Sequence, residues 1–346
     1  MARLRKMRVL KKCLGIKGKD NMQAKILIAR AIFPEVIKRL SNYFELDSNQ
    51  EDVIFTPEEL RQRLQGKQGV LCTASAKVNG DLLTQTPELK VVSNMAVGYD
   101  NFDLRACTEH KVLACNSPDV LNETTADFAW ALLMATARRV TESEHWLRAG
   151  HWDRWRYDSF LGADLHGSTL GIIGMGRIGQ AIARRSSGFG MQVLYHNRSR
   201  LLPEQEVAAN HARYVSKAEL LRTADHIILV LPYSPNTHHT IAAAEFGLMK
   251  PSTVLINVAR GGIVDDVALI AALKSGKIAA AGLDVFENEP KFHPEFLTLP
   301  NVVLTPHIAS ASRNTRLAMA NCAADNLIAA LCKGQPQNVL NPEVLR

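Results

Sequence analysis

The sequence predicts an α/β protein built from two doubly wound domains, each a parallel sheet with helices on both faces. Two observations carry this prediction. Short apolar runs alternate with helical segments from Met22 onward, a pattern typical of parallel strands joined by crossover helices. A glycine-rich turn then follows a new strand that begins at Thr169 and opens a second block of the same alternation, and 346 residues are enough for two domains.

The first block extends from Met22 to Ser117-Pro118. K-I-L-I-A-R (Lys25–Arg30) predicts a buried strand, and Phe33–Tyr43 predicts a helix. A second helix is expected after Thr56, because Thr caps it, Pro occupies the first turn and Glu59 completes a capping box. Further apolar runs predict strands at Val70–Cys72, Leu89–Val92 and Val112–Cys115.

Ser117-Pro118 marks the first predicted domain boundary. The apolar segment Thr124–Ala137 predicts a buried helix, residues 151–157 (H-W-D-R-W-R-Y) an aromatic and basic loop, and Thr315–Cys332 an amphipathic helix. We expect one domain at residues 118–314, inserted in another made of residues 22–117 and 315–346. The inserted domain has six predicted strands, at Thr169–Ile173, Gln192–Tyr195, His226–Leu231, Thr253–Val258, Ala280–Val285 and Val302–Leu304.

The positive charge of the chain is concentrated in residues 1–21. This segment contains eight Lys or Arg and one acid, which accounts for the whole formal net charge of +7. We expect this segment to be a disordered basic extension. There are three alternatives: translation truly begins at Met22, the segment is a targeting signal, or it contacts nucleic acid or a membrane. The rest of the chain is neutral, so we expect no nucleic-acid-binding face on the folded body.

The six cysteines predict neither disulfides nor a metal site. None forms C-x-x-C, and none has a His at ligand spacing. Cys72 and Cys115 lie in apolar runs and are interpreted as reduced core thiols of a cytoplasmic protein. No apolar run reaches the roughly 18 residues that a membrane helix needs, so we expect no membrane partner.

A glycine motif opens the second block. T-L-G-I-I-G-M-G-R-I-G-Q, which begins at Thr169, contains G-x-G-x-x-G between a predicted strand and a predicted helix. The first Gly allows a tight turn, the second lets the backbone approach a diphosphate, and the third lets helix pack on strand. The diphosphate is expected at the helix N-terminus, so this block is predicted to be a Rossmann domain. The predicted contacts are Gly174, Gly176, Arg177, Ile178 and Gly179.

The second strand of this block ends in residues that favour NADPH over NADH. NAD-binding sites normally place Asp or Glu at this tip to bind the ribose 2′-hydroxyl. Here the tip reads Y-H-N-R-S-R, with no acid to repel a 2′-phosphate and with two arginines and a serine that can bind it. An ordinary solvated loop is the alternative. The predicted contacts are Asn197, Arg198, Ser199 and Arg200.

Three side chains that suit reduction of a 2-oxo acid each follow a predicted strand. Arg260 follows V-L-I-N-V-A, Glu289 follows A-G-L-D-V-F, and His307 follows V-V-L-T-P. Ligands of open parallel sheets bind at the carboxyl ends of strands, so these side chains are expected to meet. Arg can bind the substrate carboxylate and polarise the ketone, His can supply the proton, and Glu can stabilise the charged imidazole. A surface arginine, a solvated acid and a structural histidine are the alternatives.

These residues, with further motifs, resemble the D-isomer-specific 2-hydroxyacid dehydrogenase family, in its branch of glyoxylate/hydroxypyruvate and 2-ketogluconate reductases. The resemblance covers nearly all of the chain from Met22, and Ala309 departs from it, because many relatives have Gly there. We therefore expect a Rossmann cofactor domain inserted in a flavodoxin-like substrate domain. The motifs are A-V-G-Y-D-N (Ala96–Asn101), S-P-D-V-L-N-E-T-T-A-D (Ser117–Asp127), G-M-G-R-I-G, N-V-A-R-G (Asn257–Gly261), G-L-D-V-F-E-N-E-P (Gly282–Pro290) and P-H-I-A-S-A (Pro306–Ala311).

The resemblance implies roles for individual residues. Arg260, Glu289 and His307 would be catalytic, with Arg260 and His307 also contacting the substrate. The amides of Val97 and Gly98 would bind the substrate carboxylate, and Ser75, in the same cleft, is expected to contact the substrate. The implied cofactor contacts are Asp284 and the Ala259 backbone at the nicotinamide carboxamide, Thr124 at the nicotinamide end, and Leu231 and Pro232 along the adenosine.

The leading hypothesis is NADPH-dependent reduction of glyoxylate, hydroxypyruvate or 2-ketogluconate to a D-2-hydroxy acid. An NAD-linked enzyme that oxidises a hydroxy acid and a dinucleotide-sensing scaffold of the corepressor type are the alternatives. The resemblance implies a homodimer, with Trp152 and Trp155 in its contact and one of them at the partner's active site; simple interface packing is the alternative. The chain ends soon after its closing helix, so we expect no regulatory domain of the kind found in some phosphoglycerate dehydrogenases.

Overall fold

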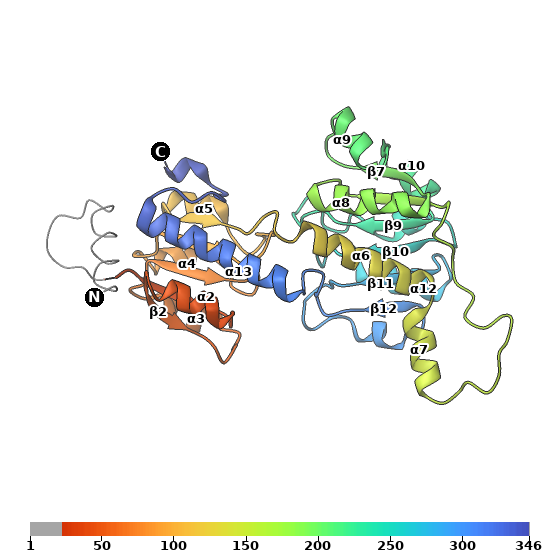
Figure 1. The fold of residues 1–346 in the computed structure, drawn as a ribbon, viewed down its shortest axis with the longest axis horizontal. Coiled ribbons are helices and arrows are strands. Elements are labelled where there is room, and N and C mark those ends of the chain that lie inside the picture. The colour runs from red at the N-terminus through yellow and green to blue at the C-terminus, as the bar shows by residue number, and fades with distance from the viewer. Residues whose placement is uncertain (1–22, 346) are drawn as a thin grey trace, which may run out of the picture.

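The computed structural model describes residues 23–345 and contains two α/β bodies side by side (Figure 1). The basic extension at residues 1–21 lies outside the described residues. Within them, no helix is long and apolar enough to cross a membrane. α6 (Asn122–Ala137) and α13 (Arg313–Ile328) each begin at the junction between the two bodies in Figure 1.

The smaller body is a parallel five-stranded sheet of order β2-β1-β3-β4-β5, the flavodoxin-like arrangement. Its strands alternate in side-chain direction: Ile26 and Ile28 pack into the core on one face, and Leu27 and Ala29 into the core on the other. The strands are β1 (Lys25–Ile28), β2 (Glu45–Ser48), β3 (Gly69–Cys72), β4 (Val91–Asn94) and β5 (Leu113–Cys115). The helices are α2 (Pro34–Leu40), α3 (Pro57–Leu64), α4 (Gly80–Thr84), α5 (Leu104–Glu109) and the returning α13 (Arg313–Ile328), followed by η3 (Ala329–Lys333) and η4 (Pro342–Leu345).

The larger body is a parallel seven-stranded sheet of order β12-β11-β10-β9-β6-β7-β8. The prediction of six strands was wrong, because β8 has only two residues and one of them, Arg213, is polar and exposed. The strands are β6 (Thr169–Ile173), β7 (Gln192–His196), β8 (Arg213–Tyr214), β9 (His226–Leu229), β10 (Val254–Asn257), β11 (Ala280–Leu283) and β12 (Val302–Leu304). The helices are α6 (Asn122–Ala137), α7 (Val140–Arg148), α8 (Arg177–Arg185), η1 (Ser186–Phe189), α9 (Pro203–Ala208), α10 (Lys217–Thr223), α11 (Ala243–Phe246), α12 (Asp266–Lys274) and η2 (Pro294–Thr298).

Strand order reverses once in each sheet. In the larger sheet the reversal is at β6, which lies between β7 and β9, and in the smaller sheet it is between β1 and β3. Open parallel sheets bind ligands at such points, beyond the carboxyl ends of the strands. The glycine turn follows β6, so the fold puts it where a ligand is expected.

Several local predictions are confirmed. Thr56 caps α3 with the full capping box: its hydroxyl accepts from the Glu59 amide at 3.3 Å, and the Glu59 carboxylate accepts from the Thr56 amide at 2.8 Å. Cys72 and Cys115 are buried free thiols, and burial raises the pKa of each to about 12. A thiol with so high a pKa is inert at neutral pH, as a core residue should be.

The two bodies are tied where the chain crosses between them. The hydroxyls of Thr124, near the start of α6, and Thr315, near the start of α13, are 2.6 Å apart. The Ser117 hydroxyl lies 2.9 Å from the carbonyl of Asn94 and 3.2 Å from that of Met319. Both crossings are therefore anchored close to the carboxyl edge of β4.

Candidate active site

The glycine turn between β6 and α8 leaves room for a diphosphate. Gly174 has φ of +102°, and a Cβ there would come within 2.7 Å of the Val230 carbonyl. A Cβ on Gly179 would overlap the carbonyl oxygen of Gly174, so the helix packs directly on the turn. A Cβ on Gly176, in contrast, would have no neighbour within 4 Å, so this backbone is open. Gly176 is the N-cap of the nine-residue α8, whose free amides suit an anion.

Other predicted cofactor residues lie near this turn. The Cβ position of Gly174 is 2.8 Å from the amide of Leu231, so the turn and the Leu231-Pro232 loop touch. Ile178 packs against the core, and the exposed Arg177 pairs with Asp119 at 3.0 Å. These contacts fit a dinucleotide lying along the carboxyl edge of β6 and β9.

At the tip of β7, Arg200 is paired with a carboxylate and, among the described residues, Arg198 is not. Arg200 donates from Nε and Nη2 to the two carboxylate oxygens of Glu206, each at 2.9 Å. Arg200 and the hydroxyl of Tyr195 lower the pKa of Glu206 to about 2, so the ion pair persists. Arg198 is exposed and has no hydrogen bond or ion pair to any residue described in the structure. Arg198, Ser199 and Asn197 therefore remain the more available phosphate ligands at this tip.

His307 and Glu289 form a hydrogen-bonded pair. Nδ1 of His307 lies 2.8 Å from Oε2 of Glu289, and the other carboxylate oxygen accepts from the Phe286 amide at 2.8 Å. Burial acts to raise the pKa of Glu289, but the hydrogen bond and charge of His307, the Phe286 amide and the charge of Arg260 together lower it. An ionised Glu289 assigns the Nδ1 proton to the bond between them and leaves Nε2 for a substrate.

The turn that carries His307 is built on Asp284. Oδ1 of this buried carboxylate accepts from the Ile308 amide at 2.8 Å and the Thr305 hydroxyl at 2.7 Å, and Oδ2 accepts from the Ala309 amide at 2.9 Å. The His307 amide donates to the Asp284 carbonyl at 2.9 Å, and His307 has φ of +53°, a strained value for a non-glycine residue. Asp284 thus fixes the backbone that presents the imidazole, in addition to its predicted role at the nicotinamide, which stays a prediction.

Arg260 crosses from the larger body to the A-V-G-Y-D-N segment of the smaller one. Its Nε donates to Asp100 Oδ1 at 3.2 Å, and Nη1 donates to the Ala259 carbonyl at 2.8 Å. Its Nη2 lies against Gly98 so closely that a Cβ on that residue would overlap the guanidinium. Arg260 therefore lies directly beside Gly98.

The backbone at residues 96–98 has bonded carbonyls and, among the described residues, two unpaired amides. The carbonyls of Ala96, Val97 and Gly98 accept from the Ser117 amide, Asn116 Nδ2 and Asn94 Nδ2, at 2.9, 2.8 and 2.8 Å. The amides of Val97 and Gly98 donate to no acceptor among the described residues. Free amides beside a guanidinium suit a carboxylate ligand.

The other predicted residues lie at the same junction, and one partner was missed. Ser75 is in the loop after β3, and Thr124 is half-buried on α6. The Ala259 amide donates to the Asn257 side chain at 3.1 Å, so its carbonyl is the part of its backbone that faces Arg260. Asp100, the partner of Arg260, was not predicted, because the two are 160 residues apart and no local pattern links them.

Comparison with known proteins identifies the family of the chain. Residues 130–309 match the model of the D-isomer specific 2-hydroxyacid dehydrogenase NAD-binding domain. A glyoxylate reductase from Thermococcus gammatolerans is 44% identical over 329 residues, which are 94% of this chain and 98% of that protein. Glyoxylate/hydroxypyruvate reductase B from Klebsiella pneumoniae is 44% identical over 329 residues, covering 93% of this chain and 100% of that protein.

Solved structures share the whole architecture. An NADPH-dependent glyoxylate/hydroxypyruvate reductase from Sinorhizobium meliloti, solved with NADP and malonate, has a TM-score of 0.81 and 36% identity, covering 92% of this chain and 97% of that one. A glyoxylate reductase from Paecilomyes thermophila has a TM-score of 0.84 and 33% identity, covering 94% and 100%. With a Rossmann sheet, its glycine turn and these similarities in hand, we conclude that the chain is an NAD(P)-dependent oxidoreductase that belongs to the D-isomer specific 2-hydroxyacid dehydrogenase family, in the branch of the glyoxylate and glyoxylate/hydroxypyruvate reductases.

Proposed function

We propose that this enzyme uses NADPH to reduce small 2-oxo acids, such as glyoxylate, hydroxypyruvate or 2-ketogluconate, to D-2-hydroxy acids. The observation that carries the proposal is the arrangement of the His307–Glu289 pair, with Arg260 close enough for its charge to act on Glu289, beside the free amides of residues 97–98. A cation, a proton donor and two amides at one place match the carboxylate and ketone of a 2-oxo acid.

The proposed chemistry divides between the residues as follows. A nicotinamide dinucleotide bound at the glycine turn supplies the hydride. The amides of Val97 and Gly98 hold the substrate carboxylate, and Arg260 binds the carboxylate and polarises the ketone oxygen. His307 Nε2 gives its proton to that oxygen as it becomes a hydroxyl. Glu289 holds the Nδ1 proton and stabilises the charged ring before the transfer.

The cofactor preference is proposed from the tip of β7. Arg198, Ser199 and Asn197 are placed to bind a 2′-phosphate, and Arg200 contributes through its free Nη1 while Glu206 holds the rest of its guanidinium. Thr124, Asp284 and Ala259 are proposed at the nicotinamide end, and Leu231 and Pro232 along the adenosine. Residues 118–314 would then form the cofactor domain, and residues 22–117 with 315–346 the substrate domain.

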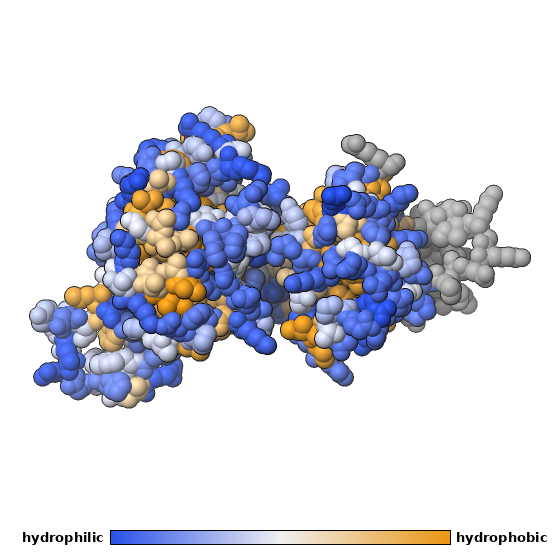
Figure 2. All heavy atoms as spheres, turned by 180° about the vertical axis from the view of Figure 1, so that it is seen from behind, coloured by the Kyte–Doolittle hydropathy of each residue, from blue (hydrophilic) through white to orange (hydrophobic). Residues whose placement is uncertain are grey.

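We also propose a homodimer built on α7 and the loop that follows it. α7 buries none of its side chains within the chain, and Trp155 and Tyr157 are 79% and 81% exposed. This segment projects from the larger body (Figure 1), and apolar side chains gather on the body beside it in Figure 2. So much exposed aromatic surface is typical of a protein interface.

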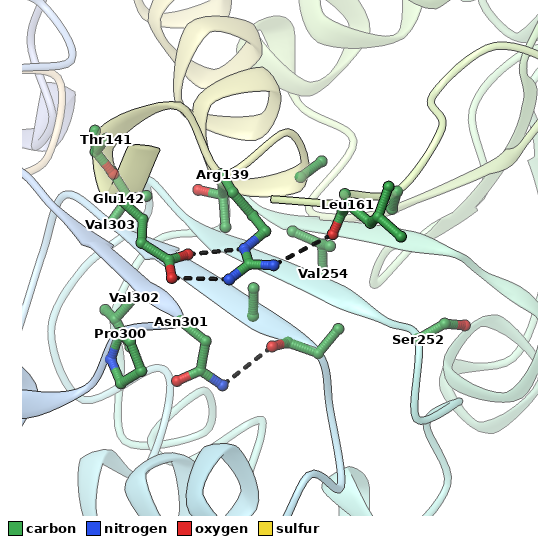
Figure 3. Close-up of a pocket in the computed structure, with 16 residues that line it drawn as sticks. Arg139, Thr141, Glu142, Leu161, Ser252, Val254, Pro300, Asn301, Val302 and Val303 are labelled. Atoms are coloured by element: carbon green, nitrogen blue, oxygen red, sulfur yellow. Dashed lines mark hydrogen bonds and ion pairs between the residues drawn. The ribbon is translucent and has the colours of Figure 1, made fainter. Parts of the chain in front are cut away.

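A groove of about 460 Å³ at the base of the projection offers a place for the second copy. Figure 3 shows its wall, where Arg139 pairs with Glu142 at 2.8 Å and lies near the Leu161 carbonyl. The groove borders Val254, Ala280 and Val302, the first residues of three strands, so it is at the opposite end of the sheet from the candidate active site. This position suits assembly rather than catalysis.

The proposed reaction is tested by following NADPH and NADH oxidation separately with glyoxylate, hydroxypyruvate and 2-ketogluconate. We expect fast oxidation of NADPH with at least one acceptor, slower oxidation of NADH, and a D-configured product where the product is chiral. Equal or faster use of NADH would contradict the cofactor assignment alone. No oxidation of either cofactor by a protein shown to bind one would contradict the proposed reaction.

A further inference from the structure

Polar groups stand in a row along the carboxyl edge of the five-stranded sheet, in the order of its strands. Asp52 follows β2, Arg30 follows β1, Ser75 follows β3, and Gly98, under Arg260, follows β4. Arg30 donates from Nε and Nη2 to the Asp52 carboxylate at 2.7 and 2.9 Å, and from Nη1 to the Ser75 hydroxyl at 3.2 Å. The row thus joins an ion pair, a hydroxyl and the proposed carboxylate site.

Arg30 and Ser75 occupy the point at which the strand order reverses. β1 and β3 are hydrogen-bonded neighbours, although β2 lies between them in the chain. A doubly wound sheet opens a crevice at such a reversal, and this is where such sheets bind ligands. The proposed reaction gives Arg30 no task, yet it is the arginine at the crevice of this sheet.

The loop that carries Ser75 is tied to the loop that carries Gly98. Asn101 Nδ2 donates to the Ala76 carbonyl at 2.8 Å, and Asn94 Nδ2 donates to Asn101 Oδ1 at 3.0 Å and to the Gly98 carbonyl at 2.8 Å. Neighbouring strands are about 4.8 Å apart, so β1 and β4 are separated by roughly 10 Å along this edge. Once the lengths of the side chains are allowed for, an acid of a few carbons held at Gly98 can reach Arg30.

We propose that Arg30, together with Ser75, binds oxygen atoms on the tail of the 2-oxo acid, beyond its ketone, and favours acceptors with an uncharged, hydroxyl-bearing tail. This inference rests on the proposed function and deepens it. Of the five N–H groups of Arg30, three are used by Asp52 and Ser75, and the side chain is 23% exposed, so donors remain for a ligand. The Ser75 oxygen accepts from Arg30 and lies 3.0 Å from the Thr73 hydroxyl; when Thr73 is the donor of that pair, the Ser75 proton is available to a ligand.

The charges of Arg30 and Asp52 explain why the substrate tail beyond the ketone should be neutral. The hydrogen bond from Arg30 lowers the pKa of Asp52 despite partial burial, so the carboxylate stays ionised and cancels the guanidinium charge. A neutral pair still offers directed N–H donors to a hydroxyl. It offers no net attraction to a second carboxylate or a phosphate, which would also lie close to Asp52.

The test is the ratio of kcat/KM for hydroxypyruvate and pyruvate, which differ only by the tail hydroxyl. We expect Arg30→Met to lower kcat/KM for hydroxypyruvate about 10- to 100-fold, the range for a lost hydrogen bond to a charged group, and to change the values for pyruvate and glyoxylate less than about threefold. Arg63→Met is the matched control, because Arg63 also pairs with an aspartate of this body, Asp47, at 2.8 Å, but lies within α3 and not after a strand. It should leave all three values near wild type.

Two further variants sharpen the outcome. Asp52→Asn should raise kcat/KM for oxaloacetate relative to hydroxypyruvate, because it leaves an uncompensated charge on Arg30. If Arg30→Met does not fold, Ser75→Ala gives the same comparison with a smaller selective loss. An equal fall for all acceptors, or no change for hydroxypyruvate, overturns the inference while wild-type turnover of glyoxylate still supports the proposed function. Absence of turnover in the wild type would remove the proposed function, and the inference with it.

Discussion

Gly98 is required by a neighbouring side chain rather than by its own backbone conformation. A Cβ at this position would overlap the guanidinium of Arg260, which is the end of a flexible side chain and can move. We therefore expect Gly98→Ala to fold normally but to displace Arg260 and lower kcat/KM by about 10²-fold, the cost of a misplaced binding group. Initial rates and a thermal melt measure both effects.

Gly80→Ala is the control for this prediction. A Cβ there would meet only the Cβ of Ala106, at 3.7 Å, which is an ordinary contact. Its kcat/KM should remain near wild type. Unchanged kinetics in Gly98→Ala would show that Arg260 does not depend on this contact.

The two arginines at the tip of β7 should differ in their importance for NADPH. Arg198 has no partner among the described residues, whereas Glu206 holds Arg200 with two hydrogen bonds. We expect Arg198→Ala to raise the KM for NADPH about 10- to 100-fold and to leave the KM for NADH unchanged, because only NADPH carries the 2′-phosphate. The same measurement on Arg200→Ala should show a smaller effect on NADPH. A larger effect in Arg200→Ala would reverse this assignment.

At the scale of the element, the start of α12 should make stability depend on pH. Burial raises the pKa of Asp266 to about 6; the Glu287 amide hydrogen bond and the charge of His293 oppose the shift, and the charges of Glu287 and Asp265 add to it. The folded state therefore binds this proton more tightly than the unfolded state. Protonated Asp266 thus stabilises the folded state below about pH 4, and this stabilisation is lost as pH rises through about 6.

Asp266→Asn should remove this dependence. Between pH 4 and pH 7 the free energy of unfolding of the wild type should fall by on the order of 1–3 kcal/mol relative to that of the variant, because each pKa unit is worth about 1.4 kcal/mol. The Asn oxygen can still accept the hydrogen bond that the Glu287 amide makes at 3.2 Å. Urea unfolding of both proteins at the two pH values measures the difference. A constant difference would mean that Asp266 titrates normally.

The regular elements could be predicted because each carries a local signal. Apolar runs gave the central strands to within one or two residues, and the Thr56 capping box gave the start of α3. β2 (E-L-D-S) and β8 (R-Y) were missed, because edge strands lie partly in solvent and need no apolar run. α7 was missed for the same reason: it has no side chain in the core to set a pattern.

The candidate site also contains residues that the sequence could place and contacts that it could not. Residues that follow strands or form the glycine turn could be placed from the sequence, because parallel strands bring their carboxyl ends to one edge. The His307–Glu289 pair is one example. Contacts between distant loops could not be predicted, because nothing local encodes them. The pair of Arg260 with Asp100, 160 residues apart, needed the structure.

At the scale of the whole molecule, the projecting α7 segment predicts a dimer that depends on its aromatic side chains. Trp155 and Tyr157 are largely exposed in the single chain. We expect the wild type to sediment as a dimer and the double variant Trp155→Ala, Tyr157→Ala to dissociate at concentrations at least 10-fold higher, since buried aromatic residues dominate interfaces. Leu202→Ala, which removes a 58% exposed side chain near α9, is the control. A monomeric wild type would contradict the proposal.

The central claim is that His307, held by Glu289, supplies the proton for reduction of a 2-oxo acid. Its most direct test is kcat/KM for NADPH-dependent reduction of hydroxypyruvate by the wild type, by His307→Ala, and by His110→Ala, which removes an exposed histidine at the end of α5. We predict a loss of about 10²–10⁴-fold in His307→Ala, with cofactor affinity retained, and near wild-type activity in His110→Ala. Activity in His307→Ala within a few fold of wild type would contradict the account.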